Sequence, residues 1–220
     1  MKTFLTLDAF GVVLAIVFGA LIFYLGGNYG LFFLAVILFF LVASALVTEF
    51  RKDEKKAMRL YEKARGWKNV FANGIVPLLA AALYYYNGVA SLNIPVNVII
   101  IAYVASVAGA TADKFSSEVG VLFGRPRMLL SMKEVRPGVS GGVSVAGFIV
   151  GLLGSYLISM SLMQFGIEVI LLSAAAGLVG DTFDSVFGFF EEKGIGNKYT
   201  SNIACAITAA AFAALVYVAV

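Results

Sequence analysis

Four acidic residues lie inside or at the ends of strongly apolar stretches of this chain. Asp113 and Glu118 belong to one motif, and Asp181 and Asp184 belong to another. A three-residue spacing places Asp181 and Asp184 on one face of a helix. Ionised carboxylates near hydrocarbon are costly unless they face protein, water or a cation. These acids are therefore the first candidates for chemistry.

Carboxylates from two helices at one membrane depth repel one another unless a cation lies between them. The chain has no histidine and a single cysteine, Cys205, which excludes a Ser-His-Asp triad, imidazole ligands and thiolate clusters. Mg²⁺ prefers oxygen ligands and commonly joins carboxylates to substrate phosphates. We therefore predict that the metal ligands and catalytic acids are Asp113, Glu118, Asp181 and Asp184.

Two alternatives for these acids stay open. They could form ion pairs with Lys114, Arg125 or Lys198 that fix the topology of the bundle. They could also serve an ion or proton pathway, but such a pathway needs polar groups through the membrane midplane, which is apolar in this sequence.

A basic, glycine-rich segment lies between the two acidic motifs. It contains Lys133 and Arg136, followed by Ser140, Gly141 and Gly142. The start of a helix binds anions through its free amides, although the spacing of a Walker loop is missing. We predict that Lys133 and Arg136 neutralise phosphates and that Ser140 and Gly141 orient them. Close helix packing is the other explanation for the glycines.

The composition indicates a single polytopic membrane domain, residues 1–220. Of its 220 residues 61% are hydrophobic and 13% are charged, against roughly 25% charged in soluble domains. We predict an all-α helical bundle with about seven transmembrane helices, and expect no nucleic-acid partner. The predicted spans are 8–25, 31–48, 71–87, 97–113, 140–162, 167–187 and 202–219.

The sixteen basic residues fix the predicted topology. Eight lie between Arg51 and Lys68, five between Lys114 and Arg136, and the others are Lys2, Lys193 and Lys198. By the positive-inside rule the loops at about 49–70, 114–139 and 188–201 are cytoplasmic, as is the N-terminus, while the C-terminus is outside. With no transit segment, a prokaryotic plasma membrane is expected. The segment 50–67 is predicted to continue the second span as a cytoplasmic helix.

Several motifs resemble one family of membrane enzymes. They are Arg65-Gly66-Trp67 with Asn69 and Asn73-Gly74, Asp113 with Ser116-Ser117-Glu118, Pro137-Gly138 with Ser140-Gly141-Gly142, and Gly180 with Asp184-Ser185, Gly188 and Asn202. The chain is similar to the integral-membrane phosphate kinases whose plant chloroplast members convert phytyl phosphate to phytyl diphosphate in vitamin E synthesis. Transmembrane protein 19-like proteins look similar. The resemblance implies a seven-helix, magnesium-dependent enzyme that uses CTP to phosphorylate a prenyl monophosphate.

The resemblance extends the list of expected site residues. Those expected to bind the nucleotide or a phosphate are Asn69, Asn73, Ser116, Ser117, Ser140, Gly141, Lys198 and Asn202. The isoprenoid chain is expected to enter an apolar slot between helices from the lipid. The chain departs from the family pattern at Lys114 and Val139, where threonines are usual, which bears on nucleotide selectivity.

Two other functions remain alternatives at this point. Dolichol kinases and CTP-dependent lipid cytidylyltransferases share a wider similarity, so a cytidylyltransferase that forms a CDP-lipid is the first. A non-enzymatic membrane carrier is the second, although no convincing repeat is present. The small-residue faces are also compatible with a homodimer.

Overall fold

The computed structural model describes residues 5–61 and 65–220. Lys2 and Lys63, which entered the predicted topology, lie outside the described residues. Long helices within the described ranges are α1 (Ala9–Leu25), α2 (Gly30–Glu49), α4 (Trp67–Ala90), α5 (Val96–Gly120), α6 (Val145–Ser159), α7 (Ile167–Glu191) and α8 (Lys198–Ala219). Shorter elements are η1 (Gly27–Tyr29), α3 (Lys52–Ala57), β1 (Arg127–Met128), β2 (Gly142–Val143) and η2 (Met160–Phe165).

The protein is a helical membrane bundle. Five helical segments of the described chain are long and apolar enough to span a membrane: Gly27–Glu49, Val96–Gly120, Val145–Phe165, Ile167–Glu191 and Lys198–Ala219. Helix α1 is apolar but shorter, with 17 residues. Helix α4 carries Asn69, Asn73, Asn87 and a run of tyrosines, which lower its hydropathy. The count of seven spans therefore stays a prediction.

Helix α5 is the centre of the bundle. It packs against α2, α4, α6, α7 and α8, and its residues from Ile99 to Ala112 are almost all buried. Helix α7 approaches α5 and α8 closely because it presents glycines to them. A Cβ on Gly180 would lie 2.6 Å from the carbonyl oxygen of Cys205, and one on Gly177 would lie 2.9 Å from the backbone of Ala108. These contacts fix the height of the adjacent Asp181.

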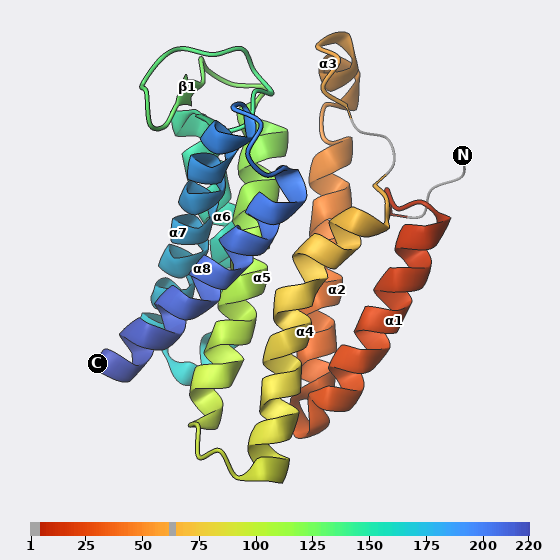
Figure 1. Cartoon of the computed structure of the whole chain (residues 1–220), viewed down its shortest axis with the longest axis vertical. Coiled ribbons are helices and arrows are strands. Elements are labelled where there is room, and N and C mark those ends of the chain that lie inside the picture. The colour runs from red at the N-terminus through yellow and green to blue at the C-terminus, as the bar shows by residue number, and fades with distance from the viewer. Residues whose placement is uncertain (1–4, 62–64) are drawn as a thin grey trace.

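The helices form two groups, and the loops divide between the two ends of the bundle (Figure 1). Helices α5 to α8 lie together, while α1, α2 and α4 form the other group beside α5. Helix α3, the β1–β2 hairpin and the α7–α8 connection are at one end, and the α1–α2 and α4–α5 connections are at the opposite end. The charged loops thus share one end, as the sequence predicts, and their cytoplasmic assignment stays a prediction.

The predicted helix over 50–67 is wrong. Helix α2 ends at Glu49, Arg51 adopts a left-handed backbone with φ 47°, and α3 extends only from Lys52 to Ala57. The chain turns back because Lys55 inserts beneath α2, where its ammonium donates to the carbonyl oxygens of Val47 at 3.1 Å and Thr48 at 2.6 Å. A cation is favourable at the C-terminal end of a helix.

Two further boundaries differ from the sequence prediction. The 114–139 loop contributes β1 to a short antiparallel hairpin with β2, so the fold is nearly, not entirely, helical. The fifth long helix begins at Val145 and not at residue 140, because Ser144 is its N-cap and accepts a hydrogen bond from the amide of Gly147 at 3.0 Å. Ser140 and Gly141 therefore precede the helix.

Candidate active site

A cavity of about 620 Å³ lies at the end of the bundle that carries the charged loops. It is enclosed by residues of α4, α5, α7 and α8 and by the loops that follow α3 and precede α6. Twelve of the fourteen residues predicted from the sequence line it. They are Asn69, Asn73, Asp113, Ser116, Ser117, Glu118, Ser140, Gly141, Asp181, Asp184, Lys198 and Asn202.

The two remaining predicted residues, Lys133 and Arg136, do not line the cavity. Both are exposed in the connection between β1 and β2. The structure therefore does not bring them together with the other site residues.

One wall of the cavity is acidic and comes from α5 and α7. Asp181 is only 7% exposed, and its Oδ1 accepts a hydrogen bond from Ser116 Oγ at 2.9 Å. Asp184 Oδ1 is buried and has no hydrogen-bond partner among the described residues. Asp113 of α5 lines the same cavity as Asp181 and Asp184 of α7. Like charges in a buried setting repel, so this wall favours a bound cation.

These oxygens fit Mg²⁺ bound together with a phosphate ligand. Asp184 Oδ1 is a buried acceptor with unused hydrogen-bonding capacity, and Asp113 and Asp181 face the same cavity. Within residues 5–61 and 65–220 there is no group of three or more acids or thiols that could hold a metal alone. Mg²⁺ needs no such cage, since it keeps waters and takes oxygens from substrate phosphates.

Glu118 belongs to a separate, basic wall. Its carboxylate oxygens form ion pairs with Lys55 Nζ at 2.7 Å, Arg65 Nη2 at 2.5 Å and Lys114 Nζ at 2.6 Å. Thr48 Oγ1 donates to Glu118 at 3.3 Å and accepts from Arg65 at 2.8 Å. Both carboxylate oxygens are thus engaged by cations, as in the ion-pair alternative, and this geometry favours an anchoring role for Glu118 over the predicted metal ligation.

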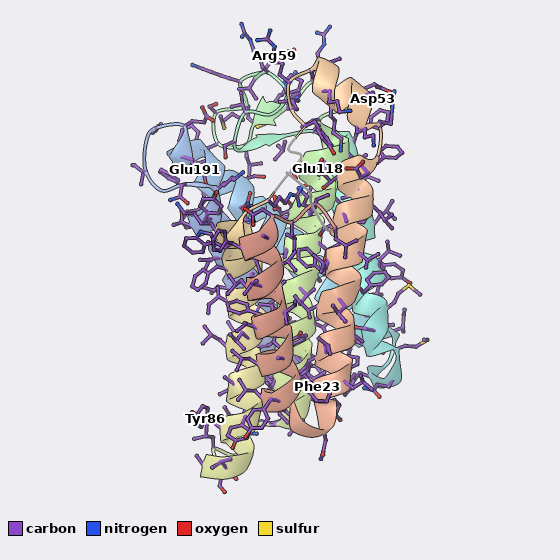
Figure 2. All side chains as sticks on the ribbon, turned by 90° about the vertical axis from the view of Figure 1, so that its right-hand side faces the viewer. Phe23, Asp53, Arg59, Tyr86, Glu118 and Glu191 are labelled. Atoms are coloured by element: carbon purple, nitrogen blue, oxygen red, sulfur yellow. The ribbon has the colours of Figure 1, made fainter. Side chains whose placement is uncertain are left out.

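The basic wall carries more positive than negative charge. Three cations surround the single carboxylate of Glu118, and all four side chains line the cavity with Arg59 and Lys198. Such an excess attracts a phosphate group to this part of the cavity. The two oppositely charged walls face one space, with Glu118 and Glu191 both near the charged end of the molecule (Figure 2).

Ser140 and Gly141 are held against α7. Ser140 Oγ donates to Glu191 Oε2 at 2.8 Å, and Ser201 Oγ of α8 donates to the other oxygen of Glu191. Gly141 has φ +76°, and a Cβ there would lie 2.6 Å from the carbonyl oxygen of Ser185. Glycine is required at position 141 because the two backbones approach closely. The segment predicted to orient phosphates is therefore a loop packed on α7 and not the start of a helix.

Two asparagine side chains, one from α4 and one from α8, meet at the edge of the cavity. Asn202 Nδ2 of α8 lies 3.4 Å from Asn73 Oδ1, and Asn73 Nδ2 donates to the carbonyl oxygen of Asn69 at 2.9 Å. Lys198 is the first residue of α8, directly after the N-cap Asn197. The predicted polar ligands of these two helices therefore lie side by side.

The loop after α3 forms the rim. Leu60 packs on Gly138, where an added Cβ would lie 2.4 Å from the leucine. Tyr61 donates to Glu49 Oε1 at 2.5 Å, and this hydrogen bond raises the pKa of the Tyr61 hydroxyl above its ordinary value. The rim thus joins the end of α2 to the loop before α6.

Sequence reasoning missed Lys55 and Glu191 as site residues. Lys55 is 1% exposed, yet it stands in a charged run that is typical of a solvated helix. Glu191 follows Asp184 by seven residues, so a helical projection of α7 places both on one face with Asp181 and Gly188. That spacing was the available signal for Glu191.

Comparisons with known proteins agree with this architecture. The family model "Integral membrane protein DUF92" matches residues 3–211. Uncharacterized membrane protein MJ0933 of Methanocaldococcus jannaschii is 34% identical over 215 residues, which is 96% of this chain and 86% of that protein. Protein PGR of Arabidopsis thaliana is 29% identical over 208 residues, covering 83% and 71% of the two chains.

A third relative is more distant. Protein VTE6, chloroplastic, of Arabidopsis thaliana is 28% identical over 158 residues, which is 70% of this chain and 46% of that protein. No solved structure matches the chain. Because the family model covers nearly the whole sequence, this chain belongs to the DUF92 family of integral membrane proteins.

Proposed function

We propose that this protein is a kinase of prenyl monophosphates. It transfers the γ-phosphoryl group of CTP to an isoprenoid monophosphate, of the phytyl or geranylgeranyl type, and releases a prenyl diphosphate and CDP. The DUF92 family membership and the resemblance of its motifs to membrane prenyl-phosphate kinases support this reaction class. The preference for CTP rests on that resemblance.

The observation that carries the proposal is the pairing of two charged walls in one cavity. Asp113, Asp181 and Asp184 line the cavity, and so do Lys55, Arg65 and Lys114, which surround Glu118. Phosphoryl transfer requires mainly that two phosphate groups be held close together with their charges neutralised. Cations from the chain and a divalent ion on the carboxylates supply both requirements.

The reaction needs no general base. The acceptor is already a phosphate anion, so one of its oxygens forms a bond to the γ-phosphorus while the bond from that phosphorus to the β-bridging oxygen breaks. The leaving oxygen stays on CDP. Arg65 and Lys114 balance the charge that spreads over the transferring group, and Asn73 and Asn202 orient the acceptor phosphate.

Asp113, Asp181 and Asp184 would supply one or two carboxylate ligands to Mg²⁺, and the ion would neutralise charge on the donor phosphates. Glu118 keeps Lys55, Arg65 and Lys114 in place on the basic wall. The cavity is lined by residues of the charged loops after α3 and before α6. This supports an active site on the cytoplasmic side of a prokaryotic plasma membrane, where nucleotides are available.

A transfer assay tests this function. Purified protein is incubated with Mg²⁺, phytyl monophosphate and CTP labelled at the γ-phosphate, and the lipid fraction is chromatographed. We expect the label in phytyl diphosphate. The paired controls are Asp184→Asn, which should not transfer label, and Glu168→Gln, which neutralises an exposed acid at the other end of the same helix and should behave as wild type.

A further inference from the structure

A second, smaller cavity opens beside the active-site cavity, between α1, α2 and α4. Its volume is about 100 Å³. Most of its lining is apolar, with Ala15, Phe18 and Gly19 from α1 and Ile37 and Leu41 from α2. We call this cavity the α1–α2 slot. An apolar slot of this kind binds hydrocarbon.

The α1–α2 slot adjoins the active-site cavity. Phe40, Arg65, Asn69 and Asn73 line both spaces. Three of these four side chains are polar, so the slot changes from apolar to polar where it meets the site. A molecule that extends through both must carry an apolar chain on a polar head group, as a lipid phosphate does.

Glycines keep the α1–α2 slot narrow but unblocked. The ring of Phe18 lies over Gly74 of α4, where an added Cβ would come within 2.6 Å of it. Gly19 also faces the slot. On the α2 side, Leu38 lines the slot while 48% of its surface is exposed on the bundle. Leu38 thus belongs both to the lining of the slot and to the outer surface of the bundle.

A buried hydroxyl in the same slot has no partner. Ser44 is 4% exposed, and its Oγ forms no hydrogen bond with any described residue. An unsatisfied buried hydroxyl is costly, and native structures rarely leave one without a reason. An oxygen atom of a ligand at the junction of slot and site would satisfy it.

We infer that the α1–α2 slot binds the first isoprene units of the acceptor lipid, with its monophosphate at Arg65, Asn69 and Asn73. This inference rests on the proposed function, whose acceptor it locates. The slot is smaller than the roughly 300–1,000 Å³ of sites that enclose a whole small ligand. The distal part of the chain therefore remains in the bilayer, and the lipid enters laterally beside α1 and α2.

Photolabelling tests the location without requiring catalysis. The probe is geranylgeranyl monophosphate with a diazirine on its first isoprene unit, added to the protein in lipid nanodiscs without nucleotide. We expect labelled peptides from α1 and α2 around Ala15–Ile22 and Ile37–Ser44, and suppression by excess phytyl monophosphate. Labelling that maps to α6–α8, or that phosphatidic acid suppresses equally well, would overturn the assignment.

A matched pair of variants blocks the slot or spares it. Ala15 lines the slot, whereas Ala20 is an exposed residue of the same helix. Ala15→Phe should reduce about tenfold the labelling that excess phytyl monophosphate suppresses. A tenfold loss of affinity corresponds to about two methylene groups of the lipid that are no longer buried. Ala20→Phe should label as wild type. Equal labelling of the two variants would contradict the inference, and the wild-type map stands even if Ala15→Phe does not fold.

The two proposals fail separately. Labelling in the slot without any transfer of phosphate from CTP would refute the kinase and leave the lipid site. Transfer of phosphate by a protein labelled elsewhere would refute the slot and leave the kinase.

Discussion

Lys55 and Glu118 are 63 positions apart in the sequence, and their charged groups lie 2.7 Å apart, with side chains that are 1% and 11% exposed. The lysine comes from the short helix α3 outside the apolar core, and the glutamate from the central helix α5. Through this pair the charged loop after α2 is tied to the helix that carries Asp113. The loop after α2 is therefore part of the basic wall.

Neutralising Glu118 should destabilise the protein. In Glu118→Gln three cations lose their common partner, and breaking a buried ion pair by removal of one partner costs about 3–5 kcal/mol. We expect a clear fall in the thermal unfolding temperature in detergent, with weaker binding of CTP. The control is Glu54→Gln, which removes an exposed pair with Arg51. An equal effect of both substitutions would contradict the anchoring role.

Neutralising Asp184, unlike neutralising Glu118, should not destabilise the protein. Asp184→Asn replaces a carboxyl group, buried at its unpaired Oδ1, by a neutral amide of the same size, so the folded state should be as stable as wild type or more so. Turnover should fall by at least about 100-fold, as when one electrostatic group of a catalytic site is removed. Thermal unfolding and phosphate transfer measured on one preparation check both parts, and full turnover would refute the metal assignment.

Lys133 and Arg136 provide a test of the structure against the sequence prediction. Both are exposed in the connection between β1 and β2, so Lys133→Ala and Arg136→Ala should keep turnover within about threefold, as surface substitutions away from a site do. Arg65→Ala, in the cavity, should abolish it. Loss of activity in the Lys133 or Arg136 variant would show that this residue takes part in the reaction, as predicted from the sequence.

The glycines of α7 should be intolerant of a methyl group. In Gly180→Ala the new Cβ would lie 2.6 Å from the carbonyl oxygen of Cys205, so α7 and α8 must separate and Asp181 must shift. We expect reduced thermal stability and reduced turnover. Gly88→Ala in α4 is the control, since a Cβ there meets no atom within 4 Å and alanine favours a helix by about 0.5–1 kcal/mol. Equal tolerance would contradict the close packing.

The long helices and the acids and amides that line the cavity could be predicted from the sequence because both depend on local patterns. Apolar stretches define the spans, and acids or amides near span ends stand out against them. Lys55 could not be predicted, since nothing in a run of exposed charges marks the one lysine that turns beneath α2. The exposure of Lys133 and Arg136 was equally hidden, because it depends on the β1–β2 hairpin between distant segments.

The most direct test of the proposed kinase compares two labels of the same nucleotide. The protein is reconstituted in liposomes with phytyl monophosphate and Mg²⁺, and CTP is supplied with label at either the γ- or the α-phosphate. We expect the γ-label in phytyl diphosphate and the α-label in CDP. Entry of α-label into the lipid with release of pyrophosphate would identify a cytidylyltransferase instead, and no transfer of either label would contradict the proposed reaction.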